Sequence, residues 1–245
     1  MSSKKIMVLV EGPKNEVKLM KHLFSLYGID EEYEIVSYCT NIYTLYKCIF
    51  DEYGGSQDVD LNQLLKSKEK DKEKHYIFDQ RYTDTILVFD LEPQDPEFSS
   101  EKIMRMCNYF NNSSDNGMLY LNYPMIEAFW HMKSIPDPNF YTYYASITEL
   151  KNRKYKQRVH DECRNGDPSK FAATRKECTV VILQNIRKAQ ALVNYTSDDL
   201  FVPDMCDILA EEIKLIDNSQ KIAVLCTCVF FIADYNPALL GPESE

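Results

Sequence analysis

The sequence predicts an α/β fold in which a parallel sheet of about four strands is flanked by helices and followed by a helical C-terminal part. As far as residue 133, short apolar runs alternate with segments of helical periodicity, an order typical of parallel sheets. The run 85–89 is apolar throughout, as expected of a strand buried on both faces. After Pro136-Asp137-Pro138 helical patterns dominate. We therefore expect a sheet domain over residues 1–135 and a mostly helical part over residues 136–245 packed on it.

The expected strands are short and rich in β-branched or aromatic residues. They cover residues 5–10, 33–38, 85–89 and 118–121. Helices are expected between and after them at residues 15–27, 41–53, 99–111 and 124–133. Each helix has a terminal signal: Gly28 ends the first, Asn41 caps the second, Ser99 or Ser100 caps the third, and Pro124 opens the fourth.

The remaining segments are less regular. Residues 66–74 form a mixed-charge run without an apolar residue. This favours an exposed loop or a solvated helix extension over a mobile lysine-rich loop that contacts a polyanion. No further convincing strand is expected in the C-terminal part. Its expected helices lie at about 146–163, 169–193, 204–216 and 219–234.

Composition limits the class of protein. The chain has 245 residues, 44% hydrophobic and 27% charged, as expected of a globular protein with one sizeable core. No apolar run reaches about 18 residues and no signal-peptide pattern is present, so we expect neither a membrane helix nor export. Eight scattered cysteines without a CxxC pair indicate reduced core thiols and a cytoplasmic location. A net charge of −10 argues against bulk coating of nucleic acid but does not exclude a nuclease.

Acidic side chains follow two of the expected strands. Glu11 comes directly after the first strand and Asp90 after the third, with Glu92 and Asp95 in the next loop. In an open parallel sheet, ligands bind outside the carboxyl ends of the strands. Carboxylates gathered there repel one another unless a cation lies among them, and ligands that are all oxygen favour Mg²⁺ or Mn²⁺. The sequence therefore predicts a divalent metal site able to act on a phosphodiester.

The first 133 residues resemble the TOPRIM domain of topoisomerases, bacterial primases and OLD-family nucleases. The segment Val10-Glu11-Gly12-Pro13-Lys14-Asn15-Glu16 is similar to V-E-G-x-x-D-E after the first strand, and Asp90-Leu91-Glu92 is similar to D-x-D after the third. The resemblance implies a TOPRIM-like, Rossmann-like fold, with Glu11 as the catalytic or metal-binding glutamate, Asp90 as the main metal ligand and Glu92 in the second acid position. Two residues depart from the pattern, because Asn15 replaces a common aspartate and Glu92 is one methylene longer than aspartate.

A narrower resemblance concerns residues 122–130. Asn122-Tyr123-Pro124-Met125-Ile126-Glu127-Ala128-Phe129-Trp130 is similar to the N-P-x-h-E-x-W-h segment of RloB-like proteins, which occur among prokaryotic defence genes; here Tyr123 separates the asparagine from the proline. The resemblance implies that Glu127 or Asp95 completes the metal ligands. A second interpretation stays open, in which Glu127 only complements the dipole of its helix.

The densest basic segment lies at residues 151–158. Its candidate nucleic-acid-binding residues are Lys151, Arg153, Lys154, Tyr155 and Arg158. Such a segment suits phosphate contacts beside a stacked base, and it equally suits a solvated helix. Lys14, at a helix start beside the acids, is expected either to meet a phosphate or to pair with one of the acids.

These observations and resemblances favour a Mg²⁺- or Mn²⁺-dependent TOPRIM-type nuclease that cleaves DNA or RNA. The resemblance alone implies a role in prokaryotic anti-phage defence. It also implies a separate ATPase or sensor subunit as a partner, since no P-loop is visible, and it leaves an oligomer open. The alternative is a catalytically silent TOPRIM-like module that regulates or recruits a partner. A primase-like nucleotidyltransferase would use the same kind of divalent metal site, but it usually needs nucleotide-binding elements that the sequence does not display.

Overall fold

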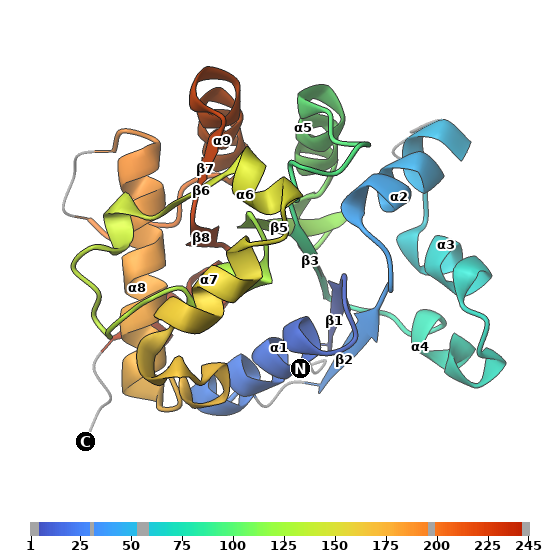
Figure 1. Ribbon diagram of the computed structural model, residues 1–245. Coiled ribbons are helices and arrows are strands. Elements are labelled where there is room, and N and C mark those ends of the chain that lie inside the picture. Colours follow the sequence, from blue (N-terminus) through green and yellow to red (C-terminus); the bar gives the residue numbers. More distant parts are fainter. Residues whose placement is uncertain (1–4, 30–31, 53–58, 196–198, 242–245) are drawn as a thin grey trace.

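The computed structural model describes residues 5–29, 32–52, 59–195 and 199–241. Its centre is a twisted sheet with the strand order β2-β1-β3-β5-β4, to which β8 adds beside β5 (Figure 1). These strands are β1 (Lys5–Val10), β2 (Glu32–Ser37), β3 (Asp84–Asp90), β4 (Asn111–Asn112), β5 (Gly117–Tyr123) and β8 (Leu225–Cys226). A separate antiparallel pair joins β6 (Tyr144–Ser146) to β7 (Lys221–Ala223).

The four strands β2, β1, β3 and β5 run parallel, whereas the short strands β4 and β8 run antiparallel to β5. The predicted α/β class with a mostly parallel central sheet flanked by helices is therefore confirmed. The apolar runs of β1 and β3 are buried because helices cover both faces of the sheet. Because β1, β3 and β5 run parallel, their carboxyl ends meet at one edge of the sheet.

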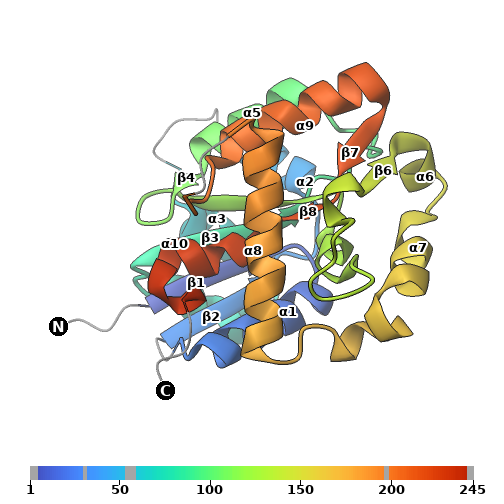
Figure 2. The same ribbon diagram turned by 90° about the vertical axis from the view of Figure 1, so that its left-hand side faces the viewer.

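Helices lie on both sides of the sheet. In Figure 1, α2 to α5 lie to one side and α1, α7 and α8 to the other; Figure 2 shows α8 crossing the face of the sheet, with α9 beside α5. The α-helices are α1 (Asn15–Tyr27), α2 (Ile42–Tyr46), α3 (Leu61–Lys68), α4 (His75–Phe78), α5 (Ser100–Tyr109), α6 (Ile147–Lys151), α7 (Tyr155–Glu162), α8 (Arg175–Leu192), α9 (Met205–Ser219) and α10 (Phe231–Tyr235).

Shorter helical turns connect these elements. The π-helical turn η1 (Lys47–Glu52) continues α2. The 3₁₀ turns are η2 (Lys72–Lys74), η3 (Ile126–Trp130), η4 (Phe140–Thr142), η5 (Arg164–Gly166), η6 (Pro168–Lys170), η7 (Cys228–Phe230) and η8 (Pro237–Leu240).

The expected terminal signals act as predicted at several helices. Gly28 ends α1 in the left-handed region, with φ 58°, and its N–H donates to Phe24 O. The Asn41 side chain accepts from the Thr44 N–H (3.0 Å) at the start of α2, and Ser99 caps α5. The sequence also favours Gly54-Gly55 as the end of the helix that Asn41 caps, and these two residues lie outside the described residues.

Three sequence expectations are wrong. Residues 124–133 do not form a long helix, since only the single 3₁₀ turn η3 follows β5. The expected helix 219–234 instead contains β7 and β8: Gln220 ends α9 in the left-handed region, and the apolar residues after it pair with strand edges. The expected helix 146–163 is divided into α6 and α7 by a turn at Arg153. By contrast, the favoured expectation for residues 66–74 is confirmed, because they form the exposed end of α3 and the solvated turn η2.

The C-terminal residues contribute to the central sheet as well as covering it. Strand β8 pairs with β5 through Asn122↔Cys226 and Tyr123↔Leu225. Because of this pairing, the segment after α9 reaches the same sheet edge as the carboxyl ends of β1 and β3. None of the described helices has the length and apolar character that a membrane span needs.

Candidate functional site

Glu11 and Asp90 lie next to each other at the carboxyl edge of the sheet. Val10 pairs with Val88 in the parallel register, so the two acids leave neighbouring strands at a similar level. The Glu11 backbone N–H donates to Val88 O (3.1 Å), and Glu11 Oε2 accepts from the Asp90 backbone N–H (3.1 Å). The structure thus brings these two predicted site residues together.

Asn122 holds the Asp90 carboxylate from the neighbouring strand. The two residues are register partners, and the fully buried Asn122 side chain donates from Nδ2 to Asp90 Oδ1 (3.3 Å). Asn122 Oδ1 in turn accepts from the Cys228 backbone N–H (3.4 Å). The sequence prediction did not assign Asn122 to the site. The signal that could have found it was a polar side chain near the end of an otherwise apolar strand, level with Asp90.

Glu16 is a second member that the sequence prediction did not assign. It lies in the first turn of α1 and is buried, with 8% of its surface exposed. Its carboxylate packs against Gly12, where a Cβ atom would lie 2.7 Å from Glu16 Oε2. Gly12 therefore leaves the space that Glu16 occupies. The closing glutamate of the Val10–Glu16 motif was the signal that could have found it.

Glu92 lies in the loop directly after β3, in the left-handed backbone region with φ 42°. This conformation is uncommon for a residue other than glycine, and such strained positions concentrate at functional sites. Two backbone hydrogen bonds hold the loop against the chain after β5: Leu91 N–H donates to Asn122 O (3.0 Å) and Glu92 N–H to Pro124 O (3.1 Å). The fold thereby fixes the Glu92 backbone near the other acids.

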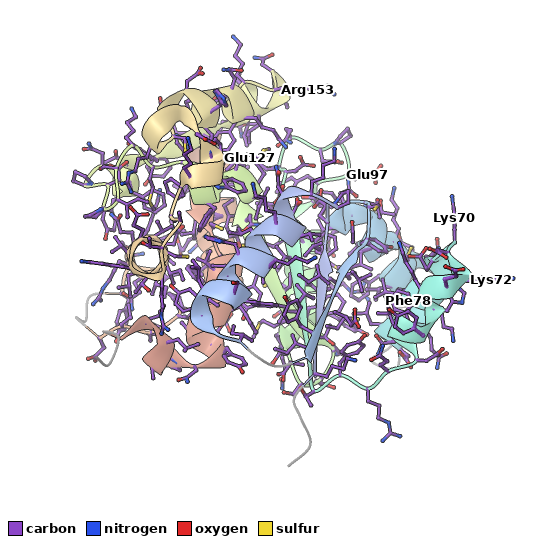
Figure 3. All side chains as sticks on the ribbon, turned by 90° about the horizontal axis from the view of Figure 1, so that it is seen from below. Lys70, Lys72, Phe78, Glu97, Glu127 and Arg153 are labelled. Carbon is purple, nitrogen blue, oxygen red and sulfur yellow. The ribbon has the colours of Figure 1, made fainter. Side chains whose placement is uncertain are left out.

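Glu127 approaches the same edge from η3. Its Oε1 pairs with Lys156 Nζ of α7 (3.1 Å). Its Oε2 is buried and has no hydrogen-bond partner within the described residues. Figure 3 shows Glu127 between α1 and the α6–α7 segment that carries Arg153. Lys156, which was outside the predicted set, thus joins the site through the helical part of the chain.

Burial and mutual repulsion make the acids hard to ionise together. Burial raises the pKa of Glu11 to about 8; the hydrogen bond from Asp90 opposes this shift, and repulsion from Glu92 and Glu16 adds to it. Burial, followed by repulsion from Glu11, Glu127 and the other acids, raises the pKa of Asp90 well above its usual range. Burial also raises the pKa of Glu16 and of Glu92. A cation among these carboxylates would offset both the free-energy cost of burying their charges and their mutual repulsion.

Lys156 is one cation that these acids hold within the chain. Burial disfavours its charged ammonium, but attraction to Glu127, Asp90 and Glu92 outweighs burial and raises its pKa. The same side chain is largely exposed, so it remains able to turn toward a ligand.

A pocket of about 520 Å³ opens beside the acids. Glu92 and Asp95 of the loop after β3 line it, together with Lys151, Arg153 and Lys156 of the α6–α7 segment. Arg153 occupies the turn between α6 and α7 with φ 56°, which directs the chain sharply at this point. The pocket therefore brings carboxylates and cations from two segments around one space.

The predicted basic segment divides into two groups. Lys151, Arg153 and Lys154 are exposed. Tyr155 is buried, at 1% exposed, and its hydroxyl lies 3.2 Å from His131 Nδ1, so the expectation that its ring stacks on a base is wrong. Arg158 is used within the fold, since its guanidinium donates to Tyr144 O (2.9 Å) and pairs with Glu149 (3.1 Å).

Asp95 and Lys14 lie at the margin of the site. Asp95 Oδ2 accepts from Asn41 Nδ2 at the start of α2 (3.0 Å), and Oδ1 accepts from the Glu97 N–H (2.7 Å), so this carboxylate fastens its loop to α2. Lys14 is exposed just before α1, and within the described residues no ion pair joins it to the clustered acids. The structure therefore does not bring Lys14 into the cluster.

The donor atoms at this edge fit a hard divalent cation. The carboxylates of Glu11, Glu16, Asp90, Glu92 and Glu127 supply only oxygen ligands, the type that Mg²⁺ and Mn²⁺ prefer. The buried Glu127 Oε2 is in addition an acceptor that lacks a donor. Across residues 5–29, 32–52, 59–195 and 199–241, no three His, Cys, Asp or Glu side chains already stand in ligating geometry. Ligation would therefore require these carboxylates to turn toward the ion.

Comparison of the chain with protein-family models, with curated proteins and with solved structures finds no match.

Proposed function

We propose that this protein is a Mg²⁺- or Mn²⁺-dependent nuclease of the TOPRIM type that hydrolyses phosphodiester bonds in DNA or RNA. One observation carries the proposal: acids from the ends of β1 and β3, from α1 and from η3 interact at one sheet edge, with exposed cations in the adjoining pocket. Phosphodiester cleavage needs both groups, because one holds the metal and the other holds the phosphate.

Glu11, Asp90 and Glu92 are the residues that would hold the metal, with Glu127 and Glu16 beside them. A bound Mg²⁺ or Mn²⁺ ion would supply an activated water and neutralise charge on the phosphate. Asn122 keeps the Asp90 carboxylate oriented through its buried amide. Glu11, with a pKa of about 8 in the absence of metal, can hold a proton near neutral pH and release it when a cation arrives.

The cations of the pocket would hold the substrate backbone. Lys151 and Arg153 line the pocket together with Glu92, and Lys156 can exchange its pairing with Glu127 for a phosphate oxygen. Their position on α6 and α7 gives the helical C-terminal part a role in substrate binding. The proposed cytoplasmic location, anti-phage role and separate ATPase or sensor subunit rest on the sequence features and resemblances.

The substitution Asp90→Asn tests the proposal. We expect it to abolish Mg²⁺-dependent cleavage of labelled DNA and RNA, because the buried carboxylate is removed while the new amide can still accept from Asn122. The melting temperature should be unchanged or higher, since one of several repelling acids is removed.

The matched control is Asp84→Asn, at the opposite end of the same strand, where the carboxylate accepts from Ser113 Oγ (2.8 Å). This variant should retain cleavage. A purified Asp90→Asn protein that cuts at the wild-type rate would refute the assignment.

A catalytically silent module is the second candidate, and Lys156 is the observation that favours it. Its ammonium already compensates Glu127, Asp90 and Glu92, as a metal ion would. If this lysine substitutes for the metal permanently, the wild-type protein will bind neither Mg²⁺ nor Mn²⁺, and Lys156→Ala will weaken the fold rather than open a metal site.

A further inference from the structure

A second pocket, of about 310 Å³, adjoins the acidic site. One wall is α1, with Lys18 and His22, and the opposite wall is α7, with Lys156 and His160. Glu127 and Lys156 line it as well, so it shares one boundary with the acid cluster. Two segments distant in sequence thus form a cavity directly beside the candidate metal ligands.

The floor of this pocket is aromatic. Phe129 packs edge-on against Trp130 (ring centroids 5.5 Å apart, interplanar angle 88°) and against Phe171 (5.5 Å, 80°). Phe129 and Phe171 are buried, whereas Trp130 is partly exposed. The contact with Phe129 supports the Trp130 ring, and the three rings together give the pocket an apolar aromatic surface that suits a flat ligand.

The rim of the pocket is polar and carries cations. Lys18 is exposed on α1, and Lys156 faces it from α7. A ligand that suits both parts has a flat apolar body and an anionic group that lies beside Lys18 and Lys156.

We propose that this pocket receives one unpaired nucleobase of the strand whose phosphodiester lies at the acid cluster. Its position beside the scissile phosphate rests on the proposed function. Its volume lies within the range of small-molecule sites, and base stacking on aromatic side chains tolerates every base. A base held in a duplex cannot enter, so the substrate is single-stranded or has its base turned out of the helix.

Trp130 makes the inference testable, because it is the single tryptophan of the chain. Its fluorescence, excited selectively over the 17 tyrosines, reports on this pocket alone. Titration of the metal-free protein with adenosine should change the emission saturably, whereas ribose should leave it unchanged. No saturable response to adenosine, or an equal response to ribose, overturns the proposal.

The rim is tested with adenosine 5′-monophosphate in the presence of Mg²⁺. Lys18→Glu should weaken its binding about tenfold, as expected when a cation beside a phosphate becomes an anion. Lys21→Glu is the matched control, since Lys21 is exposed on the same helix but does not line the pocket. Equal weakening by the two substitutions overturns the placement of the phosphate beside Lys18.

These measurements separate the inference from the proposed function. Adenosine carries no phosphate and its titration needs no metal, so its result does not depend on cleavage. A wild-type protein that binds adenosine but cuts no nucleic acid would support the nucleobase pocket and refute the proposed nuclease activity. A protein that cuts nucleic acid but gives no Trp130 response would sustain the nuclease and refute the pocket.

Discussion

The titration of Glu11 links the stability of the fold to the candidate site. Burial raises its pKa to about 8 in the folded chain, above the ordinary value of 4.5. The stabilisation from its protonated form is complete below pH 4.5 and disappears as pH rises through about 8. Without divalent metal, the melting temperature of the wild-type protein should therefore fall across this window more steeply than that of Glu11→Gln, which cannot ionise.

Thermal unfolding with a chelator present, from about pH 5 to about pH 9, measures this difference. Glu212, with a pKa raised by burial to about 8, and Lys188, with a pKa lowered by burial to about 7, titrate in both proteins, so their contributions cancel. Parallel curves for the two proteins would contradict a raised pKa of Glu11 in the folded chain.

The residues of the site differ in how far the sequence could predict them. Glu11 and Asp90 follow apolar strands directly, so strand order alone predicts that they meet. Asn122 could be assigned to the site only once the pairing between β3 and β5 was known. Lys156 could be assigned only once it was known how α7 folds back over η3. Tyr155 failed as a stacking residue because helical spacing does not reveal which face of a short helix is buried.

At the scale of elements, the α6–α7 turn is the predicted point at which the protein binds the substrate backbone. Changing Lys151, Arg153 and Lys154 to alanine should weaken binding to all sequences alike. It should also flatten the dependence of log affinity on log salt by about 0.9 for each phosphate of duplex DNA that the variant no longer neutralises. Affinity measured at several salt concentrations with catalytically inactive Asp90→Asn protein checks both effects.

The matched control removes Lys70, Lys72 and Lys74, which are all exposed. Figure 3 shows Lys70 and Lys72 at the right-hand edge of the molecule, away from Arg153 at the top. This change removes the same charge and should leave the salt slope near the wild-type value. If both triple variants weaken binding equally, the α6–α7 turn has no particular role. Arg158 is unsuited to this test, because its removal would disturb the contacts with Glu149 and Tyr144.

Sequence periodicity predicted the central elements well and the last part of the chain poorly. The strand β1 and helix α1 have the predicted limits, since strand apolarity, helical spacing and the glycine stop agree there. Residues 222–233 are apolar except for Thr227, and an apolar run of this kind does not distinguish a helix from buried strands. Only the edge of β5, open to pairing with β8, decides between them.

For the whole molecule, the sheet and the helical C-terminal part form the site together. Acids come from the ends of β1 and β3, from α1 and from η3, whereas the cations beside them come from α6 and α7. Burial and, after it, mutual repulsion disfavour the ionised form of these acids, and a divalent cation would offset both effects. The central claim is therefore that this edge of the sheet binds a metal ion.

Anomalous diffraction from crystals soaked in Mn²⁺ tests this claim most directly. We predict a peak between the carboxylates of Glu11 and Asp90, with oxygen ligands at about 2.1 Å, and no such peak in Asp90→Asn crystals. Lys156 should then have turned away from Glu127 toward solvent. Well-diffracting Mn²⁺-soaked crystals without a peak at Glu11 and Asp90, and with Lys156 still paired to Glu127, would contradict the metal site and favour the silent module.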